Sequence, residues 1–292
     1  KRAFLLGDIV NSNPTFVGPA IDYGYGKLPA ATQAGSYATY LNDKRSRSEG
    51  LVFIGANDGM LHAFKESNGH EVFAYVPHAV LPQIHLLAQP DYAHRYFVDG
   101  PTSQGDFYDA AASRWRTALV ASAGAGAKSV FAIDASSNVL TAESVLWEVH
   151  SGMTPTFAEL GNVLSEARIG QLADGTWVTL FGNGVHSKSG KAMLFIVNAK
   201  TGALVHAVDT GVAGNNGLGG AYPVLNARNQ IVGVYAGDLK GNLWRFAPKT
   251  SDPTQWEARL LFSVSAGLQQ AFTATPLGLA HPDGGMVVVA GT

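Results

Sequence analysis

The chain has 292 residues, of which 46% are apolar and only 14% are charged, so its composition is that of a folded protein with a large core. Twenty basic residues stand against 22 acidic ones, and this near-neutral balance argues against a nucleic-acid-binding surface. The chain contains no cysteine, which excludes disulfides, thiolate zinc sites and cysteine nucleophiles. No apolar run reaches the roughly 18 residues that a membrane-spanning helix needs, so we expect no transmembrane segment.

The predicted elements, in chain order, are mostly short strands joined by glycine-containing turns. The stretch LVFIGANDGMLHAF, residues 51–64, has two apolar runs separated by a polar pair. Related stretches follow at residues 118–138, 178–202 and 232–246, and a shorter run closes the chain at residues 287–292. Each stretch is typical of a β-hairpin.

A second pattern precedes each hairpin, and its marker residues recur at intervals of 67, 55 and 53 residues. These markers are Pro101, Arg168, Pro223 and Pro276. A period of this size with several short strands is the signature of a β-propeller blade. Because one hairpin cannot bury its own apolar face, the units are expected to stack radially and cover one another.

We therefore predict an all-β fold, a β-propeller of quinoprotein-like four-stranded blades with short helical insertions. About five partial units are visible, and the intact domain would have up to seven blades. Residues 1–292 are expected to form a single propeller domain, a fragment of a larger secreted protein, because the chain starts without an initiator methionine or signal peptide.

The polar and glycine residues between the apolar runs are assigned to tight turns instead of an active site. Asn57, Asp58 and Gly59 separate the two runs of the first hairpin. Asp-Gly and Asn-Gly pairs favour the positive φ values that a tight hairpin needs. The same assignment covers the corresponding residues downstream, namely Gly182, Gly237, Asp238, Gly241 and Asn242.

Two segments are longer than a blade connection should be, residues 19–50 and residues 77–95. The first contains a predicted helix over residues 36–44, with three residues on one face: Tyr37, Tyr40 and Leu41. The second contains a predicted helix with three apolar residues on one side: Val80, Ile84 and Leu87. Long insertions of this kind usually lie on one rim of a propeller, where binding surfaces form.

No pattern in the sequence supports catalysis, and we predict no catalytic residue. The nine histidines lack the spacing of a zinc hydrolase, and the glycines at 124–126 and 184–192 lack the spacing of nucleotide-binding loops. The carboxylates of Asp99 and Asp106 are candidates for a pair that the sequence cannot place in space. The one basic run is expected to be a solvated loop: Lys44, Arg45 and Arg47. Four tryptophans are expected to pack between blades: Trp115, Trp147, Trp177 and Trp244.

Six motifs occur in order along nearly the whole chain, from about Gly7 to the final strand. They are FVGP, GANDGMLHAF, HRYFVDGP, WRTALV, FAELGNV followed by GNG, and YAGDLKGNLWRF. This series resembles the PilC/PilY family of type IV pilus tip adhesins and biogenesis factors. The resemblance implies the C-terminal propeller of a large secreted protein that acts at the outer surface, outer membrane or pilus tip of Gram-negative bacteria. It also implies that the domain counters pilus retraction, associates with minor pilins and promotes attachment to surfaces or to a host-cell receptor.

Many members of that family carry a calcium loop just before the YAGDL strand. Counting back from Tyr235, the matching positions here are Val224, Asn226, Arg228 and Val232. Calcium takes six to eight oxygen ligands, and of these positions only Asn226 offers a side-chain oxygen, while Arg228 would add a positive charge. We therefore expect no metal and no other cofactor, and a weak, shifted calcium site through Asn229 and Gln230 is the alternative.

Two other functions are compatible with a propeller sequence. One is an outer-membrane assembly scaffold, which organises other envelope proteins. The other is a quinone-dependent dehydrogenase, which would need a calcium-bound cofactor in the central channel. We favour a non-enzymatic module that presents the insertions at 19–50 and 77–95 to a pilin or a host receptor.

Overall fold

The computed structural model describes residues 6–19, 21–29, 33–265 and 270–292, and its main feature is a series of four antiparallel sheets. Each sheet has four strands in sequence order, and we call the sheets blades 1 to 4. Blade 1 consists of β1 (Thr15–Val17), β2 (Leu51–Gly55), β3 (Leu61–Lys65) and β4 (Glu71–Tyr75). Blade 2 consists of β5 (Thr102–Asp109), β6 (Arg114–Ser122), β7 (Ser129–Asp134) and β8 (Val145–His150).

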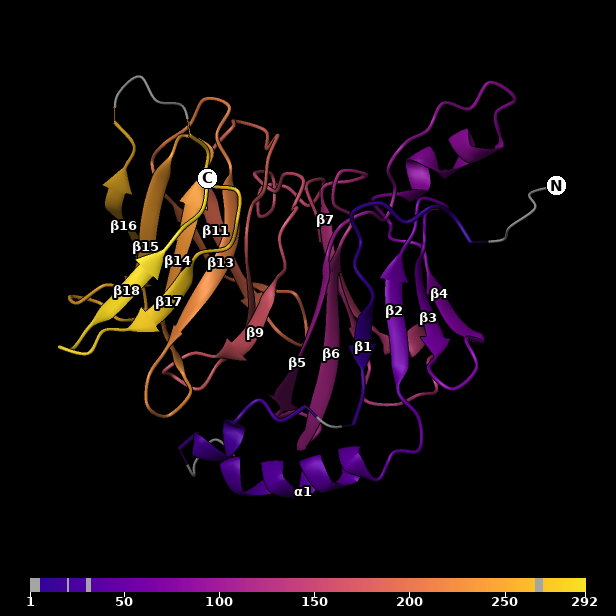
Figure 1. The fold of residues 1–292 in the computed structure, drawn as a ribbon, viewed down its shortest axis with the longest axis horizontal. Coiled ribbons are helices and arrows are strands. Elements are labelled where there is room, and N and C mark those ends of the chain that lie inside the picture. The colour runs from indigo at the N-terminus through magenta and orange to yellow at the C-terminus, as the bar shows by residue number, and fades with distance from the viewer. Residues whose placement is uncertain (1–5, 20, 30–32, 266–269) are drawn as a thin grey trace.

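The two later blades repeat this order, and a smaller sheet follows them. Blade 3 consists of β9 (Arg168–Gln171), β10 (Trp177–Gly182), β11 (Met193–Asn198) and β12 (Leu204–Asp209). Blade 4 consists of β13 (Leu218–Leu225), β14 (Ile231–Asp238), β15 (Asn242–Pro248) and β16 (Trp256–Ser263). The smaller sheet pairs β17 (Leu277–Ala280) with β18 (Met286–Val289). The first strands of successive units contact one another, from β1 through β5, β9 and β13 to β17, and Figure 1 shows the blades side by side.

The predicted all-β propeller with about five units is confirmed, and the burial of its strands explains why the hairpins could be found. The middle strand β10 is buried at every residue, whereas the outer strand β12 is fully buried only at Val208. A strand that is covered on both faces has a continuous run of apolar residues, which is easy to recognise in a sequence. The recurring stretches are accordingly the two middle strands of each blade.

The apolar core lies between neighbouring blades. Phe53 of blade 1 and Phe131 of blade 2 belong to one cluster, and both are completely buried. Trp147 of blade 2 packs with Phe195 of blade 3 in the next cluster, and Leu180 of blade 3 packs with blade 4 in the third. Each fully buried side chain of this size contributes about 1.5–3 kcal/mol to folding, so the blades hold one another in place.

Two glycines that the sequence assigned to turns lie at strand ends instead. Gly182 is the last residue of β10, and a Cβ atom there would lie 2.2 Å from the carbonyl oxygen of Gly219. Gly237 lies in β14, and a Cβ atom there would lie 2.2 Å from Cβ of Phe272. Close approach of the next inner segment, and not a positive φ angle, therefore requires glycine at these two positions.

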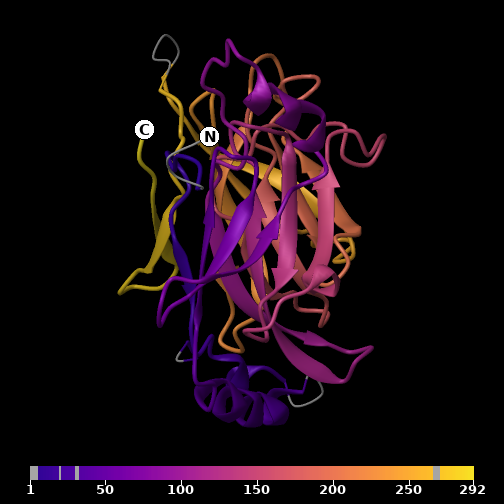
Figure 2. The same cartoon turned by 90° about the vertical axis from the view of Figure 1, so that its right-hand side faces the viewer.

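The two insertions lie at opposite ends of the blades, which corrects the expectation of a shared rim. The first forms η1 (Tyr25–Lys27) and α1 (Ala34–Arg45), which runs across the lower ends of β1, β5 and β6 in Figure 1. The second forms the 3₁₀ helix η3 (Leu81–Ala88) at the upper end, and Figure 2 shows the same separation from the side. A further short helix, η4 (Ala142–Ser144), precedes β8. Within the described residues, no helix has the length and apolar character to cross a membrane.

Candidate functional site

The turn between β2 and β3 ties distant segments to blade 1. Asn57 and Asp58 lie in this turn, and Gly59 follows them with φ +98°. The Oδ2 atom of Asp58 accepts a hydrogen bond from the N–H of Gly7 at 2.7 Å. The Oδ1 atom of Asn57 accepts one from the N–H of Phe97 at 3.0 Å. These turn residues therefore position the chain on either side of the blade as well as closing the hairpin.

A buried histidine lies beside this turn, between two carboxylates. The Nε2 atom of His62 lies 3.1 Å from Oδ1 of Asp58, and its Nδ1 atom lies 2.6 Å from Oε1 of Glu71. Burial lowers the pKa of His62, but the hydrogen bonds to Asp58 and Glu71 outweigh that effect and raise it above its usual value. Burial also raises the pKa of Asp58, and the bonds from His62 and Gly7 more than reverse this, so that pKa is lowered. The sequence pattern favoured satisfied or surface histidines over metal ligands, but it did not identify this position of His62 between Asp58 and Glu71, which we call the His62 clamp.

The corresponding turn of blade 4 is organised by a buried aspartate. Asp238 is completely buried, and its Oδ1 atom accepts hydrogen bonds from two N–H groups of the turn. Its Oδ2 atom accepts from Nδ2 of Asn242 at 2.9 Å, Nε1 of Trp244 at 2.9 Å and Nδ2 of Asn216 at 3.0 Å. Gly241 completes the turn with φ +76°. Five hydrogen-bond donors satisfy the carboxylate of Asp238, so this residue has a structural role in the turn.

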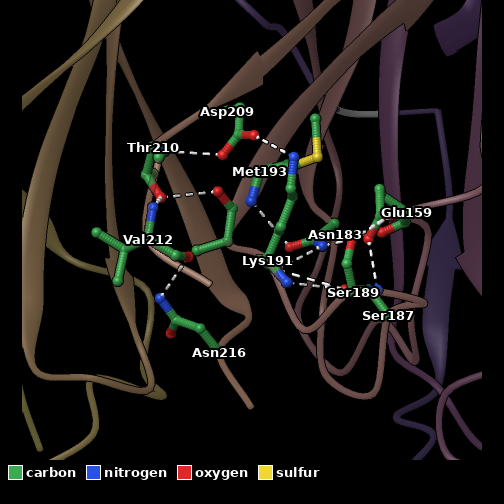
Figure 3. Close-up of polar contacts among 12 residues, drawn as sticks. Glu159, Asn183, Ser187, Ser189, Lys191, Met193, Asp209, Thr210, Val212 and Asn216 are labelled. Atoms are coloured by element: carbon green, nitrogen blue, oxygen red, sulfur yellow. Dashed lines mark hydrogen bonds and ion pairs between the residues drawn. The ribbon is translucent and has the colours of Figure 1, made fainter. Parts of the chain in front are cut away.

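The long turn of blade 3 is held by side chains beneath it, as Figure 3 shows. The Oδ1 atom of Asn183 accepts a hydrogen bond from the N–H of Met193 at 3.0 Å, and its Nδ2 donates to the carbonyl of Lys191 at 2.9 Å. The carboxylate of Glu159 accepts from the N–H of Ser189 at 3.0 Å. The ammonium of Lys191 lies 2.8 Å from Oδ2 of Asp209. These contacts fix residues 183–191, which border a surface hollow described below.

The positions compared with a calcium loop lie in the hairpin of β13 and β14, two of them in the strands and two, Asn226 and Arg228, in the turn between the strands. They are Val224, Asn226, Arg228 and Val232. The Oδ1 atom of Asn226 accepts hydrogen bonds from the N–H groups of Arg228 at 2.9 Å and Gln230 at 3.0 Å, so protein donors already occupy this oxygen. The Nδ2 atom of Asn229 donates to the carbonyl of Tyr23 at 2.8 Å. Across the residues that the structure places, no group of three or more His, Asp or Glu side chains is arranged to hold a metal ion.

A buried ion pair anchors the first insertion to blade 2. The ammonium of Lys44 lies 2.9 Å from Oδ2 of Asp106, and both side chains are at most 1% exposed. Tyr37 and Thr117 donate hydrogen bonds to the same carboxylate at 2.8 and 2.6 Å. Burial raises the pKa of Asp106 and lowers that of Lys44, and the attraction within the pair opposes both changes.

The basic run was predicted to be solvated, and for Lys44 this is wrong. Arg45 is exposed, but one helical position earlier Lys44 turns into the interface with blade 2. Its partner lies 62 residues away, so no local pattern could reveal the pair. Asp99, the other carboxylate considered, accepts hydrogen bonds from Asn11 and does not share this network with Asp106.

Aromatic side chains also pack the first insertion against the lower end of the blades. Tyr25 is buried, with its ring stacked 5.8 Å from that of Trp115 and edge-on 4.8 Å from that of Trp177. The four tryptophans expected to pack are all buried: Trp115, Trp147, Trp177 and Trp244. Together with the Asn229–Tyr23 bond, these contacts connect the first insertion to blades 2, 3 and 4.

The opposite end of the blades is open and carries two hollows, which we call together the upper face. The first, of about 500 Å³, lies between η3 and blade 2 and is lined by His78, Gln83, Lys128, His150, Ser151 and Asn162 among others. The second, of about 650 Å³, lies between blades 3 and 4 and is lined by His186, Lys188, Ser189, Gly214, Asn215 and Asn216 among others. Concave surfaces on a rigid frame suit recognition of a partner.

Comparison with known proteins identifies the family. The model of the PilY1 beta-propeller domain matches residues 6–292. The chain belongs to the PilY1 β-propeller family. A type IV pilus biogenesis factor PilY1 homolog of Xylella fastidiosa is 40% identical over 283 residues, covering 95% of this chain and 22% of that protein. The type IV pilus biogenesis factor PilY1 of Pseudomonas aeruginosa is 35% identical over 325 residues, covering all of this chain and 27% of that protein.

A solved structure supports the family assignment. The crystal structure of the Pseudomonas aeruginosa PilY1 C-terminal domain superposes with a TM-score of 0.79 at 32% identity, over 95% of this chain and 59% of that one. The chain spans about a quarter of the length of the curated relatives it matches. The resemblance to the PilC/PilY family is confirmed, and pilus biogenesis is the role in which its relatives are named.

Proposed function

We propose that this chain is the propeller region of a non-enzymatic type IV pilus factor at the bacterial surface. In this role it supports pilus extension against retraction, associates with minor pilins at the pilus tip and promotes surface attachment. The observation that carries the proposal is the family match over residues 6–292, whose relatives are named as pilus biogenesis factors.

The arrangement of the two ends supports a mechanism based on recognition. The first insertion packs on the lower end through Lys44 and Tyr25, and the upper face presents its two hollows to a partner. The carboxylates in the turns, such as Asp58 and Asp238, are occupied by hydrogen-bond donors of the chain itself. Of the two insertions, the segment at 77–95 is the one that borders the upper face, and we expect it to take part in partner contact.

Piliation of cells tests this proposal. In a bacterium that makes the full-length protein, residues 6–292 are deleted in frame, and surface pili are counted with the retraction motor present and absent. We expect few pili when retraction is active and recovery when it is disabled, with the remainder of the protein verified by immunoblotting. Unchanged piliation in both backgrounds would overturn the proposal and favour an envelope scaffold.

A further inference from the structure

Among the described residues, none that lines the two hollows of the upper face carries a carboxylate. The chain as a whole has 22 acidic and 20 basic residues, so this composition is local. The lining instead includes two ammonium groups, those of Lys128 and Lys188, and three imidazoles, those of His78, His150 and His186. The rings of His78 and His150 lie 5.1 Å apart and form one wall of the first hollow.

Three carboxylates contact lining residues directly and accept hydrogen bonds from the chain itself: Glu148, Glu159 and Asp238. Glu148 accepts hydrogen bonds from the hydroxyl of Tyr75 at 2.8 Å and the N–H of His78 at 2.7 Å. Glu159 accepts from Ser189, and Asp209 pairs with Lys191, as Figure 3 shows. The oxygens of Glu148 and Glu159 are therefore satisfied by neutral donors, Asp209 is paired with a cation, and none of these carboxylates lies within 4.0 Å of the ammonium of Lys128 or Lys188.

The lysines themselves lack acidic partners. Lys128 donates a hydrogen bond to the backbone carbonyl of His186 at 2.5 Å, which positions its ammonium between the two hollows. Within the part of the chain that the structure places, no carboxylate lies within 4.0 Å of the ammonium of Lys128 or Lys188. A carboxylate supplied from outside would complete these contacts.

The shape of the surface favours a segment of protein as the source of that carboxylate. Of the five described non-glycine residues with a positive φ angle, two border the second hollow: His186 with φ +59° and Asn215 with φ +54°. Backbone held in this region clusters at ligand-binding sites. A concave surface accommodates an extended chain, whereas a lipid bilayer would require a flat or convex one.

We propose that the upper face binds an acidic, extended segment of a partner protein, with its carboxylates on Lys128 and Lys188. The inference rests on the proposed function, because it specifies the chemistry by which a pilus-tip protein would be recognised. Such charge complementarity mainly provides specificity and fast association, and salt weakens it.

Fluorescence anisotropy with the purified chain tests the inference. The probe is a short fluorescein-labelled peptide of alternating glutamate and serine, and the control probe has lysine in place of glutamate. The variant Lys128→Gln/Lys188→Gln is compared with Lys27→Gln/Lys249→Gln, which removes two cations from the lower end. Thermal melting shows that each variant is folded.

We expect the acidic probe to bind, the basic probe not to bind, and the affinity to fall about tenfold in Lys128→Gln/Lys188→Gln but less than about twofold in the control variant. Binding should weaken between about 50 and about 300 mM salt. Equal losses in both double variants, or binding of phosphatidylglycerol vesicles without binding of the peptide, would overturn the inference. Because the assay uses the isolated chain, its failure leaves the piliation test unaffected, and failure of that test does not alter the binding result.

Discussion

Replacing Lys44 by methionine removes one partner of the buried ion pair and should destabilise the protein strongly. Both side chains are at most 1% exposed, so water cannot compensate the carboxylate of Asp106 that is left behind. Removing one partner of a buried pair costs about 3–5 kcal/mol in other proteins. Here Tyr37 and Thr117 still donate to the carboxylate, so we expect the lower end of this range, about 3 kcal/mol.

Urea denaturation followed by circular dichroism measures this effect. The sign of its pH dependence follows from burial, which raises the pKa of Asp106: at low pH the orphaned carboxyl takes up a proton, so the loss should be smaller at about pH 5 than at about pH 8. Lys27→Met, at an exposed position of the same insertion, should change the free energy of unfolding by less than about 0.5 kcal/mol. A loss below about 1 kcal/mol for Lys44→Met at both pH values would refute the anchoring role of the pair.

Three further predictions concern the turns and strand ends. Gly237→Val should lower the melting temperature by several degrees, because its Cβ would lie 2.2 Å from that of Phe272. The control Gly35→Ala should not lower it, because a Cβ there meets nothing within 4 Å. Equal melting temperatures for the two variants would contradict the close approach of Phe272 to Gly237. The part of the stability difference between wild type and His62→Gln that depends on the charge of His62 should be full below pH 6.5 and be lost as pH rises through the raised pKa of His62. Urea titrations showing the same difference at every pH would refute the clamp. Millimolar calcium should change the melting temperature little, because N–H groups occupy the side-chain oxygen in the turn at 226–230, and a shift of many degrees would show a calcium site there.

The strands that could be predicted are those that consist of continuous apolar runs. The middle strands of each blade are covered on both faces, so β10 and β11 could be recognised without a structure. The outer strands have mixed patterns: β12 exposes half of its residues and β16 exposes most of them, which makes their boundaries hard to place. Local burial therefore decided which strands the sequence reasoning found.

The parts that escaped prediction depend on contacts between distant residues. Lys44 reads as a solvated cation unless Asp106 is known to lie beside it, and Gly237 reads as a turn residue unless Phe272 is known to approach it. The separation of the two insertions to opposite ends was equally invisible. The hollows of the upper face could not be predicted for the same reason, because their linings come from η3 and from turns of three blades.

We propose that this domain acts in type IV pilus biogenesis, and co-fractionation of the domain with pili tests that proposal directly. Pili are sheared from cells that make the full-length protein, and the sheared fraction is probed with an antibody against residues 6–292. We expect the domain to be found with the sheared pili and to be absent from the sheared fraction of cells that lack pilins. Retention of the domain in the envelope, with no signal in a pilus-rich fraction, would contradict it.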